Sequence, residues 1–363
     1  MGPEYFCDRK QETSLLLKAI ASKRNVTLIS LRRMGKTGLL KHVKYQLEQE
    51  KNSLVVIYAD LLPTMNGNDM LNTLSSALLQ VKYRERNIVQ KLLALLATLR
   101  PRMTFDSLTG KPSVQLTVEN PTDVQFGFSH LLQFISEVKQ DLVFMLDEFQ
   151  QINRYPENNM ESLLRSVIQA YPGIPFIFSG SSKHMLEPMF SAAGRPFYQS
   201  AELMYLEKIK EAEYRDFILE KFSLGHRQIS TEAIDRLCEW TRLHTFYVQH
   251  VCNLLYETGS QHVDVSVLNQ VFQRVLVSNE PLFASFRNLL PAQQYRLLRA
   301  IAVENGIDKP TSGAFIQKHG LISASSVAAS LKALADKEMI ALSVDKWQVY
   351  DVFFSRWLEY HYK

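Results

Sequence analysis

Thr27-Leu-Ile-Ser-Leu-Arg-Arg-Met-Gly-Lys-Thr37 is the stretch of sequence that decides the fold. It begins as an apolar run, becomes polar at Gly35-Lys-Thr37, and continues into a helical pattern from Leu39 to Val43. Buried parallel strands are covered on both faces and therefore appear as continuous apolar runs. The stretch predicts such a strand, followed by a tight loop and a helix.

The loop matches the phosphate-binding pattern G-x-x-x-x-G-K-[ST] except at its first position, where Ser30 replaces glycine. Backbone N–H groups and the helix N-terminus bind the phosphates in this pattern, the lysine reaches the β- and γ-phosphates, and the hydroxyl holds Mg²⁺. A serine fits if residue 30 needs no positive φ. The alternative is a chance Gly-Lys-Thr with Lys36 on the surface. The residues expected to contact ATP are Ser30, Arg32, Arg33, Met34, Gly35, Lys36, Thr37 and Gly38.

A second apolar run, Leu142-Val-Phe-Met-Leu146, ends in the carboxylate pair Asp147-Glu148. An acid at the end of a neighbouring parallel strand can organise Mg²⁺ together with Thr37, and we assign this role to Asp147. Glu148 is then the candidate general base that polarises the attacking water. The alternative is that both acids cap the following helix.

A third apolar run, Ile174 to Phe178, ends in Ser179-Gly-Ser-Ser182. Hydroxyls at this strand end could place a polar sensor beside the γ-phosphate, and we assign that role to Ser179. Ser181 and Ser182 could instead cap the next helix.

Composition limits the class of protein. The chain has 363 residues, of which 46% are hydrophobic, enough for a large core and two or three domains. Its net charge of +4 neither demands nor excludes nucleic acid. The 3 cysteines are widely spaced, no apolar run approaches the length of a membrane span, and the amino terminus lacks the regions of a signal peptide. We expect a cytoplasmic protein in a reducing compartment, with no membrane partner.

Strand and helix patterns alternate up to about residue 206, which predicts an α/β core with a mostly parallel sheet covered on both faces. Leu54 to Ala59 is a further buried strand, and Asp69 to Leu99 has helical periodicity. An insertion near residues 100–118 alternates on either side of Thr109-Gly110, which predicts a β-hairpin. We assign residues 1–206 to a P-loop NTPase core.

The rest of the chain has two further patterns. Helices without strands are expected from Glu211 to Lys221, Thr231 to Arg242 and Phe246 to Thr258, and we assign residues 207–285 to a helical lid over the nucleotide. Residues 286–363 show three helices followed by a two-stranded pattern that turns at Asp345-Lys346. This order predicts a C-terminal winged helix–turn–helix.

The candidate recognition helix of this last domain, Ser323 to Lys337, offers only Lys332 and Lys337, with Asp336 opposing them. DNA-reading helices usually present several Arg, Lys, Asn or Gln side chains. DNA therefore stays a possible but weakly supported partner. A winged helix that packs on its own core or on another protein is the alternative.

These segments together resemble the archaeal-type ATPases, which are relatives of the signal-transducing multidomain (STAND) ATPases and of the AAA+ proteins. The resemblance covers nearly the full chain. It is carried by Phe6-Cys-Asp-Arg-Lys-Gln-Glu12, Leu31-Arg-Arg-Met-Gly-Lys-Thr37, Leu146-Asp-Glu-Phe-Gln150, Phe178-Ser-Gly-Ser-Ser182, Gly194-Arg-Pro-Phe-Tyr198 and Val349-Tyr-Asp-Val-Phe-Phe-Ser-Arg-Trp-Leu358.

The resemblance implies roles for two more residues. Arg195 precedes the expected last core strand, Ala201 to Leu206, where relatives place an arginine that acts on a neighbour's γ-phosphate. A surface or interdomain salt bridge is the alternative. Arg9 is expected near the adenine edge. In the lid, His244-Thr-Phe-Tyr247 stands where relatives often have Gly-x-Pro.

Three functions are consistent with these residues. The leading hypothesis is a Mg²⁺-dependent ATP hydrolase that acts as a nucleotide-driven switch, with a protein partner or a second copy supplying the missing arginine. The second is a nucleotide-responsive DNA-binding regulator. The third is a degenerate P-loop scaffold that hydrolyses nothing, which Ser30 makes conceivable.

Overall fold

The computed structural model describes residues 6–49, 54–81, 90, 94, 101–105, 110, 112–116, 121–137, 141–181, 183–343 and 345–362. The chain divides into two compact units, Met1–Glu207 and Lys208–Lys363. Three expectations fall outside the described residues, namely the end of a helix at Leu99, a hairpin turn at Thr109 and a helix cap at Ser182.

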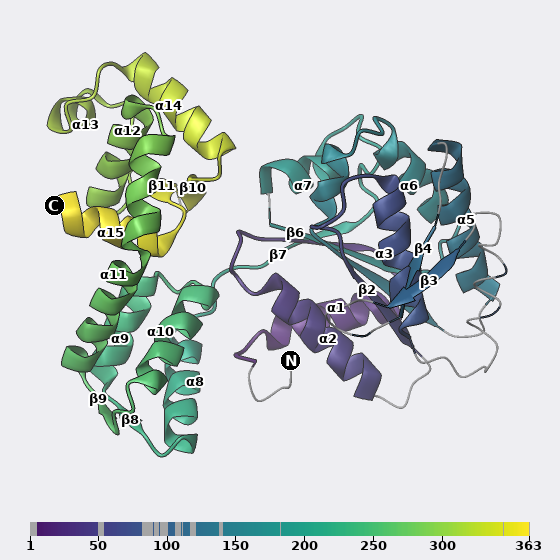
Figure 1. The fold of residues 1–363 in the computed structure, drawn as a ribbon, viewed down its shortest axis with the longest axis horizontal. Coiled ribbons are helices and arrows are strands. Elements are labelled where there is room, and N and C mark those ends of the chain that lie inside the picture. Colours follow the sequence, from purple (N-terminus) through teal and green to yellow (C-terminus); the bar gives the residue numbers. More distant parts are fainter. Residues whose placement is uncertain are drawn as a thin grey trace. The chain divides into compact units, whose positions relative to one another are not determined.

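A five-stranded sheet lies at the centre of the first unit (Figure 1). Its strands are β1 (Val26–Ile29), β2 (Val55–Asp60), β5 (Leu142–Asp147), β6 (Phe176–Gly180) and β7 (Glu202–Tyr205). They are arranged in the order β2-β5-β6-β1-β7, and every neighbouring pair is parallel. The expected α/β class with a parallel sheet is therefore confirmed, and the carboxyl ends of the strands share one edge.

Helices cover both faces of this sheet, as parallel crossovers require (Figure 1). One face packs against α1 (Lys10–Ala21) and α2 (Lys36–Gln49). The other packs against four α-helices of the described part of this unit, which are α3 (Gly67–Leu79), α5 (Pro121–Glu137), α6 (Met160–Gln169) and α7 (Lys183–Ser191).

Four phenylalanines pack together next to the carboxyl ends of β5 and β6. Phe149, the first residue of the 3-10 helix η3 (Phe149–Arg154), packs against Phe178 with ring centroids 4.6 Å apart. Phe190 and Phe197 complete the cluster, with the other centroid distances between 5.0 and 6.1 Å. Because Phe149 follows Glu148 and Phe178 precedes Ser179, this packing sets where both polar strand ends lie.

The strands β3 (Arg102–Phe105) and β4 (Pro112–Gln115) pair in antiparallel fashion outside the main sheet. The second strand docks on α3 through backbone donors. Val114 N donates to Ser76 Oγ at 3.0 Å, and Leu116 N donates to Asn72 Oδ1 at 2.7 Å.

The second unit begins with four helices, α8 (Glu211–Leu224), α9 (Thr231–Thr241), α10 (Thr245–Glu257) and α11 (Val265–Leu289). The expectation that this part contains no strands is wrong. The two-residue strands β8 (Gln228–Ile229) and β9 (His262–Val263) pair in parallel between them. Segments this short carry no periodic pattern, so the sequence could not reveal them.

The expected winged-helix pattern follows. Its helices are α12 (Ala292–Val303), α13 (Gly313–Lys318) and α14 (Ala324–Asp336), and its wing is formed by β10 (Ile340–Ser343) and β11 (Lys346–Val349), with α15 (Val352–Tyr362) at the end. The turn was expected at Asp345-Lys346, but Lys346 already belongs to β11. Asp345 provides the positive φ of 66° that the turn requires.

A buried network joins the helices of the second unit to its winged helix. The helix α9 ends at Thr241, one residue earlier than predicted, and Arg242 caps it with a φ of 52°. Its guanidinium donates to Val349 O at 3.3 Å, and to Asn305 Oδ1 and Ser355 Oγ at 2.8 Å each. It also pairs with Glu359 at 3.4 Å. These bonds fix the wing and α15 against α9.

In the described part of the chain, no helix is both long and apolar enough to cross a membrane.

Candidate active site

The loop between β1 and α2 has a backbone that suits phosphate binding. Arg33 and Gly35 have positive φ, 66° and 96°, whereas Ser30 does not. A side chain at residue 30 therefore causes no backbone strain, and the condition that allows serine in place of the first glycine is met. Gly38 lies in the first turn of α2, and no heavy atom lies within 4 Å of the place where its Cβ would be.

Lys36 is a buried cation at the start of α2, with 5% of its surface exposed. Its Nζ donates to Ser30 O at 3.3 Å, to Ser30 Oγ at 3.1 Å and to Leu31 O at 3.1 Å. Burial lowers the pKa of Lys36 from 10.5 to about 8, although the nearby Glu148 and Asp147 oppose this shift. A desolvated ammonium that binds only neutral oxygens can gain much from a phosphate.

Asp147 ends β5 and is 1% exposed. Its Oδ2 accepts hydrogen bonds from Thr37 Oγ1 at 2.6 Å and from Tyr58 OH at 3.0 Å, and its Oδ1 accepts from Glu148 N at 3.1 Å. The predicted metal pair, Thr37 and Asp147, is therefore in direct contact. Because the threonine uses its proton on Asp147, its oxygen lone pairs stay available for a cation.

Tyr58, on β2, is a member of the site that sequence reasoning missed. Burial and the neighbouring Asp147 carboxylate raise the pKa of its phenol, so the hydroxyl stays a donor at all ordinary pH values. The parallel register aligns Tyr58 with Met145 and Asp60 with Asp147. Nothing local in the β2 sequence marks this tyrosine, because its role depends on that register.

Glu148 has a left-handed backbone, with φ 55° and ψ 41°, at the start of η3. Its Oε2 accepts from Ser181 Oγ at 2.8 Å and from Gln150 Nε2 at 2.5 Å. Ser181 Oγ in turn accepts from Arg32 Nε at 3.3 Å. The loop arginine, the serine and the candidate base thus form one chain of hydrogen bonds.

Gly180 allows this arrangement by leaving room for Gln150. A Cβ at residue 180 would lie 2.0 Å from Gln150 Oε1, so any other residue would displace the amide that holds Glu148. Ser181 and Gln150 were not predicted as site residues. The hydroxyl-rich run after β6 was a usable signal, but it did not indicate which serine faces Glu148.

Ser179 lies inside β6, paired with Leu28 of β1, and is fully buried. Among the described residues its Oγ has no hydrogen-bond partner. Its hydroxyl therefore does not join the network around Glu148, whereas that of Ser181, two residues later, does.

The predicted arginines lie in different surroundings. Arg9 is 4% exposed, donates to Glu12 Oε1 at 2.8 Å, and reaches the carbonyl of the buried loop residue Met34 at 3.4 Å. The Arg9 side chain therefore holds the loop between β1 and α2 through the Met34 carbonyl. Arg195 donates to Asn153 Oδ1 at 3.1 Å and forms an ion pair with Glu161. Those contacts place it with η3 and α6 and not in the network of Lys36, Asp147 and Glu148.

The described residues contain no cluster of three or more His, Cys, Asp or Glu side chains able to hold a metal ion. A cation at Thr37 and Asp147 would therefore depend on phosphate oxygens and water for its other ligands. This is the usual way in which Mg²⁺ is held with a nucleotide.

Comparison with known proteins agrees with this geometry. A family model described as "Probable winged helix domain" matches residues 281–360. No curated protein matches the chain in sequence.

Several solved structures share the fold along nearly the whole chain. The Walker-type ATPase paby2304 of Pyrococcus abyssi is 15% identical with a TM-score of 0.67, and the match covers 98% of this chain and 97% of that one. The Aeropyrum pernix ORC2 protein, solved as ADPNP-ADP complexes, is 15% identical with a TM-score of 0.57, covering 99% and 95%. The Aeropyrum pernix ORC1 protein, solved in complex with DNA, is 13% identical with a TM-score of 0.52, covering 99% and 94%.

At these identities the likeness establishes the fold, and it agrees with the resemblance inferred from the sequence. The chain shares its fold with these proteins, among them a Walker-type ATPase, and residues 281–360 match the winged helix domain model.

Proposed function

We propose that this chain is an ATP-binding, Mg²⁺-dependent ATPase that works as a nucleotide-driven switch. One observation carries the proposal. The 2.6 Å hydrogen bond between Thr37 Oγ1 and Asp147 Oδ2 brings together two segments 110 residues apart, each identified from the sequence as half of a nucleotide site. Lys36 directly precedes Thr37 in the sequence, and Glu148 directly follows Asp147.

The side chains present fit a magnesium nucleotide. Lys36 offers a buried positive charge that no described carboxylate neutralises by an ion pair, so a phosphate oxygen can replace the loop carbonyls that it now binds. Thr37 and Asp147 would hold the cation, which supplies positive charge next to the transferring phosphoryl group. The loop N–H groups and the amino end of α2 would bind the phosphates.

Glu148 is the proposed general base. Both hydrogen bonds that its carboxylate accepts go to Oε2, and no described residue donates to Oε1. The free oxygen can accept a proton from a water that attacks the γ-phosphorus, while Ser181 and Gln150 hold the carboxylate in place. Arg32, at the other side of Ser181, adds positive charge at the same place.

Arg195 is proposed to act on the nucleotide of a neighbouring copy, and its ion pair with Glu161 gives the resting position from which it would be released. The intrinsic rate of a single chain is then slow. A transition-state arginine is worth about 10³- to 10⁵-fold in related reactions, so turnover should rise with protein concentration. Self-association or a protein partner is therefore part of the proposal.

The output of the switch is proposed to be a movement of residues 208–363 as one piece. Arg242 and Arg356 bind the helices of this unit to its winged helix, and Arg356 donates to the carbonyl oxygens of Trp240 and Glu239 at 3.0 and 2.9 Å. A lid that closes on nucleotide would carry the winged helix with it.

ATP turnover of the Glu148→Gln variant tests this function. A missing general base costs about 10²- to 10⁴-fold in rate, while nucleotide affinity should be kept because Glu148 is not a phosphate ligand. Glu48→Gln, which removes a half-exposed acid of α2 paired with Lys44, is the matched control and should turn over ATP like the wild type. Equal turnover by Glu148→Gln and the wild type would remove Glu148 from the mechanism.

A degenerate scaffold that binds no nucleotide is distinguished by thermal shift. ATP with Mg²⁺ at a hundred times its Kd should stabilise the native chain by about 2.7 kcal/mol. Absence of any shift at millimolar ATP would favour the scaffold.

DNA binding is the second candidate, because the winged helix is present and ORC1, which shares the fold, was solved with DNA. α14 carries one basic side chain, Lys332, and Lys337, which caps the helix at its C-terminal end, is already bonded to Gln294 at 3.0 Å. A gel-shift titration with duplex DNA at low salt, with and without ATP, tests this candidate. Phosphate-driven binding should weaken steeply as salt is raised.

A further inference from the structure

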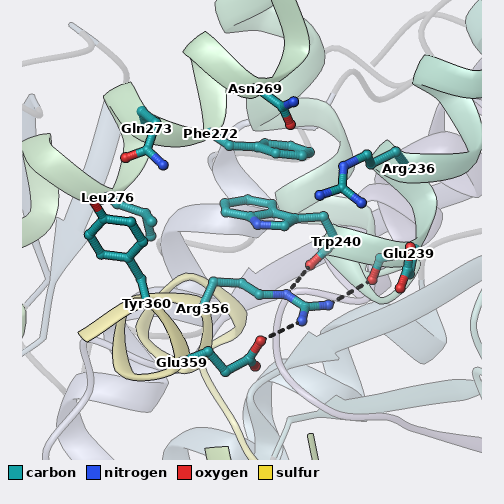
Figure 2. A pocket seen from close by; sticks show the side chains of 10 residues that line it. All are labelled: Arg236, Glu239, Trp240, Asn269, Phe272, Gln273, Leu276, Arg356, Glu359 and Tyr360. Atoms are coloured by element: carbon teal, nitrogen blue, oxygen red, sulfur yellow. Dashed lines mark hydrogen bonds and ion pairs between the residues drawn. The ribbon is translucent and has the colours of Figure 1, made fainter. Parts of the chain in front are cut away.

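A cavity of about 520 Å³ lies within the second unit, between α9, α11 and α15 (Figure 2). This volume is typical of ligand sites. It belongs to a part of the chain that the nucleotide site does not use, and its lining comes from segments more than a hundred residues apart.

The floor of the cavity is aromatic and rigid. The Trp240 indole stacks on the Phe272 ring with centroids 4.1 Å apart and planes 11° apart, and Leu276 is buried beside them. Figure 2 shows Leu276 and Tyr360 together at one side of the cavity. Tyr360 is 62% exposed. A partner's apolar side chain that contacts Tyr360 and the half-buried Trp240 would bury surface that is now in water.

The charges around the floor are of two kinds. Arg356 and Glu359 are committed to structure, because Arg356 bonds two backbone carbonyls and pairs with Glu359 at 2.8 Å. Arg236 and Glu239, on the opposite rim, are exposed, and neither side chain makes a hydrogen bond or ion pair with any described residue. The rim thus offers one uncommitted guanidinium, which complements a carboxylate, and one uncommitted carboxylate, which can accept a hydrogen bond.

Two side-chain amides lie along the same edge. Asn269 and Gln273 are four residues apart on α11, so they lie on one face of the helix, and both line the cavity (Figure 2). Within the described chain neither amide has a protein partner. Each can donate and accept a hydrogen bond at once, which is the pairing that an extended peptide backbone offers.

We propose that this cavity is a docking site for an extended segment of a partner protein that combines an apolar side chain with a nearby Asp or Glu. The apolar side chain enters between Trp240, Leu276 and Tyr360. The acid pairs with Arg236, and the segment's backbone bonds to Asn269 and Gln273. Trp, Tyr and Arg are the residues most enriched at the energetic centres of protein interfaces, and all three line this site.

The site gives the switch a place to hold a client. α9 and α11 belong to the helical part of the unit and α15 to the winged-helix part, so a bound segment contacts both. This inference stands without the nucleotide site, because no group that it uses belongs to residues 1–207.

The experiment is a binding titration with the full chain, followed by fluorescence anisotropy. The probes are labelled, acetylated and amidated hexapeptides that contain one aspartate and one leucine or phenylalanine at every relative spacing. Matched peptides carry lysine in place of the aspartate. We expect the best acidic peptide to bind more tightly than its lysine counterpart, and Arg236→Glu to weaken it by about tenfold or more.

Charge exchange provides the decisive comparison. Arg236→Glu should bind the lysine peptide better than the aspartate peptide, a reversal that mere loss of structure cannot produce. Gln273→Ala should weaken both the wild-type complex and the reversed one by a few fold. Lys332→Glu, an exposed change on α14, is the control for net charge and should leave peptide binding unchanged.

Three results would overturn the proposal. The first is that no peptide binds at millimolar concentration. The second is that Arg236→Glu and the wild type bind the acidic peptides equally well. The third is that a small aromatic acid such as indole-3-acetate binds more tightly than every peptide, in which case the site takes a metabolite and not a protein segment.

Discussion

Lys36 in the first unit and Arg242 in the second are both buried cations, but their surroundings are opposite in kind. Arg242, in the second unit, is 8% exposed at its side chain and lies within 3.4 Å of the Glu359 carboxylate, with three further acceptors around it. Lys36, in the first unit, binds only two carbonyl oxygens and one hydroxyl. Burial is the main cause that lowers both pKa values, to about 10 for Arg242 and about 8 for Lys36.

The difference separates a charge that holds elements together from one that we propose binds a phosphate. A buried charge with a counterion and a full set of acceptors is close to its lowest free energy, so it holds elements together. A buried charge that lacks a counterion weakens the fold and gains most when an anion arrives. When each cation is replaced by methionine, which is apolar and of similar length, the free energy of unfolding should therefore fall for Arg242 and not for Lys36. ATP affinity should fall for Lys36 and not for Arg242.

Arg242→Met should give the larger loss of stability. It leaves Val349 O, Asn305 Oδ1 and Ser355 Oγ without this donor, and each buried polar group left unsatisfied costs about 1–3 kcal/mol of unfolding free energy. Glu359 keeps its 2.8 Å ion pair with Arg356. The positive φ of residue 242 is equally unfavourable for both side chains, so backbone strain does not enter the difference. Urea unfolding, followed by circular dichroism, measures the change.

ATP affinity of Arg242→Met should be that of the wild type, since every contact of Arg242 lies in residues 208–363. Arg274→Met is the control, because Arg274 pairs with Glu257 with both side chains 56% exposed. Exposed pairs contribute about 0–1 kcal/mol. A comparable loss of stability in both variants would contradict a special role for the buried network.

Lys36→Met should show the reverse pattern. ATP binding should weaken by about 2–5 kcal/mol, the usual result of removing one partner of a buried charge pair. The unfolding free energy at pH 7 should not fall, and it should rise by at most about 3 kcal/mol, because the cost of burying the charge is removed. Calorimetry gives the first quantity and urea unfolding gives the second.

The pH dependence identifies Lys36 as the cause. Between about pH 8, the pKa of the folded state, and 10.5, that of the unfolded state, the unfolded chain keeps a proton that the folded chain has released. The unfolded state then binds more protons, so wild-type stability gains from this group as pH rises through that window and lacks the gain below pH 8. In Lys36→Met this contribution should be absent. Identical pH slopes in the two proteins would show that Lys36 is not desolvated.

The sequence predicted those parts of the site that lie in continuous motifs. Gly35-Lys-Thr37 and Asp147-Glu148 each sit at the end of an apolar strand, and parallel pairing must bring such ends to one edge, so their meeting followed from the fold class. The helices and the wing of the C-terminal domain were predicted for the same reason, because periodicity is local. Two of the predicted elements of the second unit differ by one residue at an end, at Arg242 and Lys346, and the short strands β8 and β9 were not predicted.

The unpredicted parts depend on register and on packing between distant elements. Ser181 and not Ser179 reaches Glu148, because Ser179 is still inside β6 and pairs with β1. Gln150 reaches Glu148 only because residue 180 is glycine. The cavity around Trp240 is assembled from three helices, and none of their sequences is unusual alone. Such features require the relative positions of elements, which no local pattern contains.

Tyr58→Phe is the smallest change and tests the finest part of the comparison, the support of the metal carboxylate. It removes one of the two hydroxyls that donate to Asp147 Oδ2 and leaves Thr37 in place. We expect a loss of about 1 kcal/mol in unfolding free energy, and about a tenfold increase at most in the Mg²⁺ concentration needed for half-maximal turnover.

Tyr155→Phe is the matched control, because it removes another buried tyrosine hydroxyl, bonded to Thr64 and not to Asp147. Both variants should lose similar stability, but only Tyr58→Phe should change the Mg²⁺ requirement. If both change it equally, the effect comes from general loosening of the core. If neither changes it, Thr37 alone positions the carboxylate, and Tyr58 serves only the packing of β2 against β5.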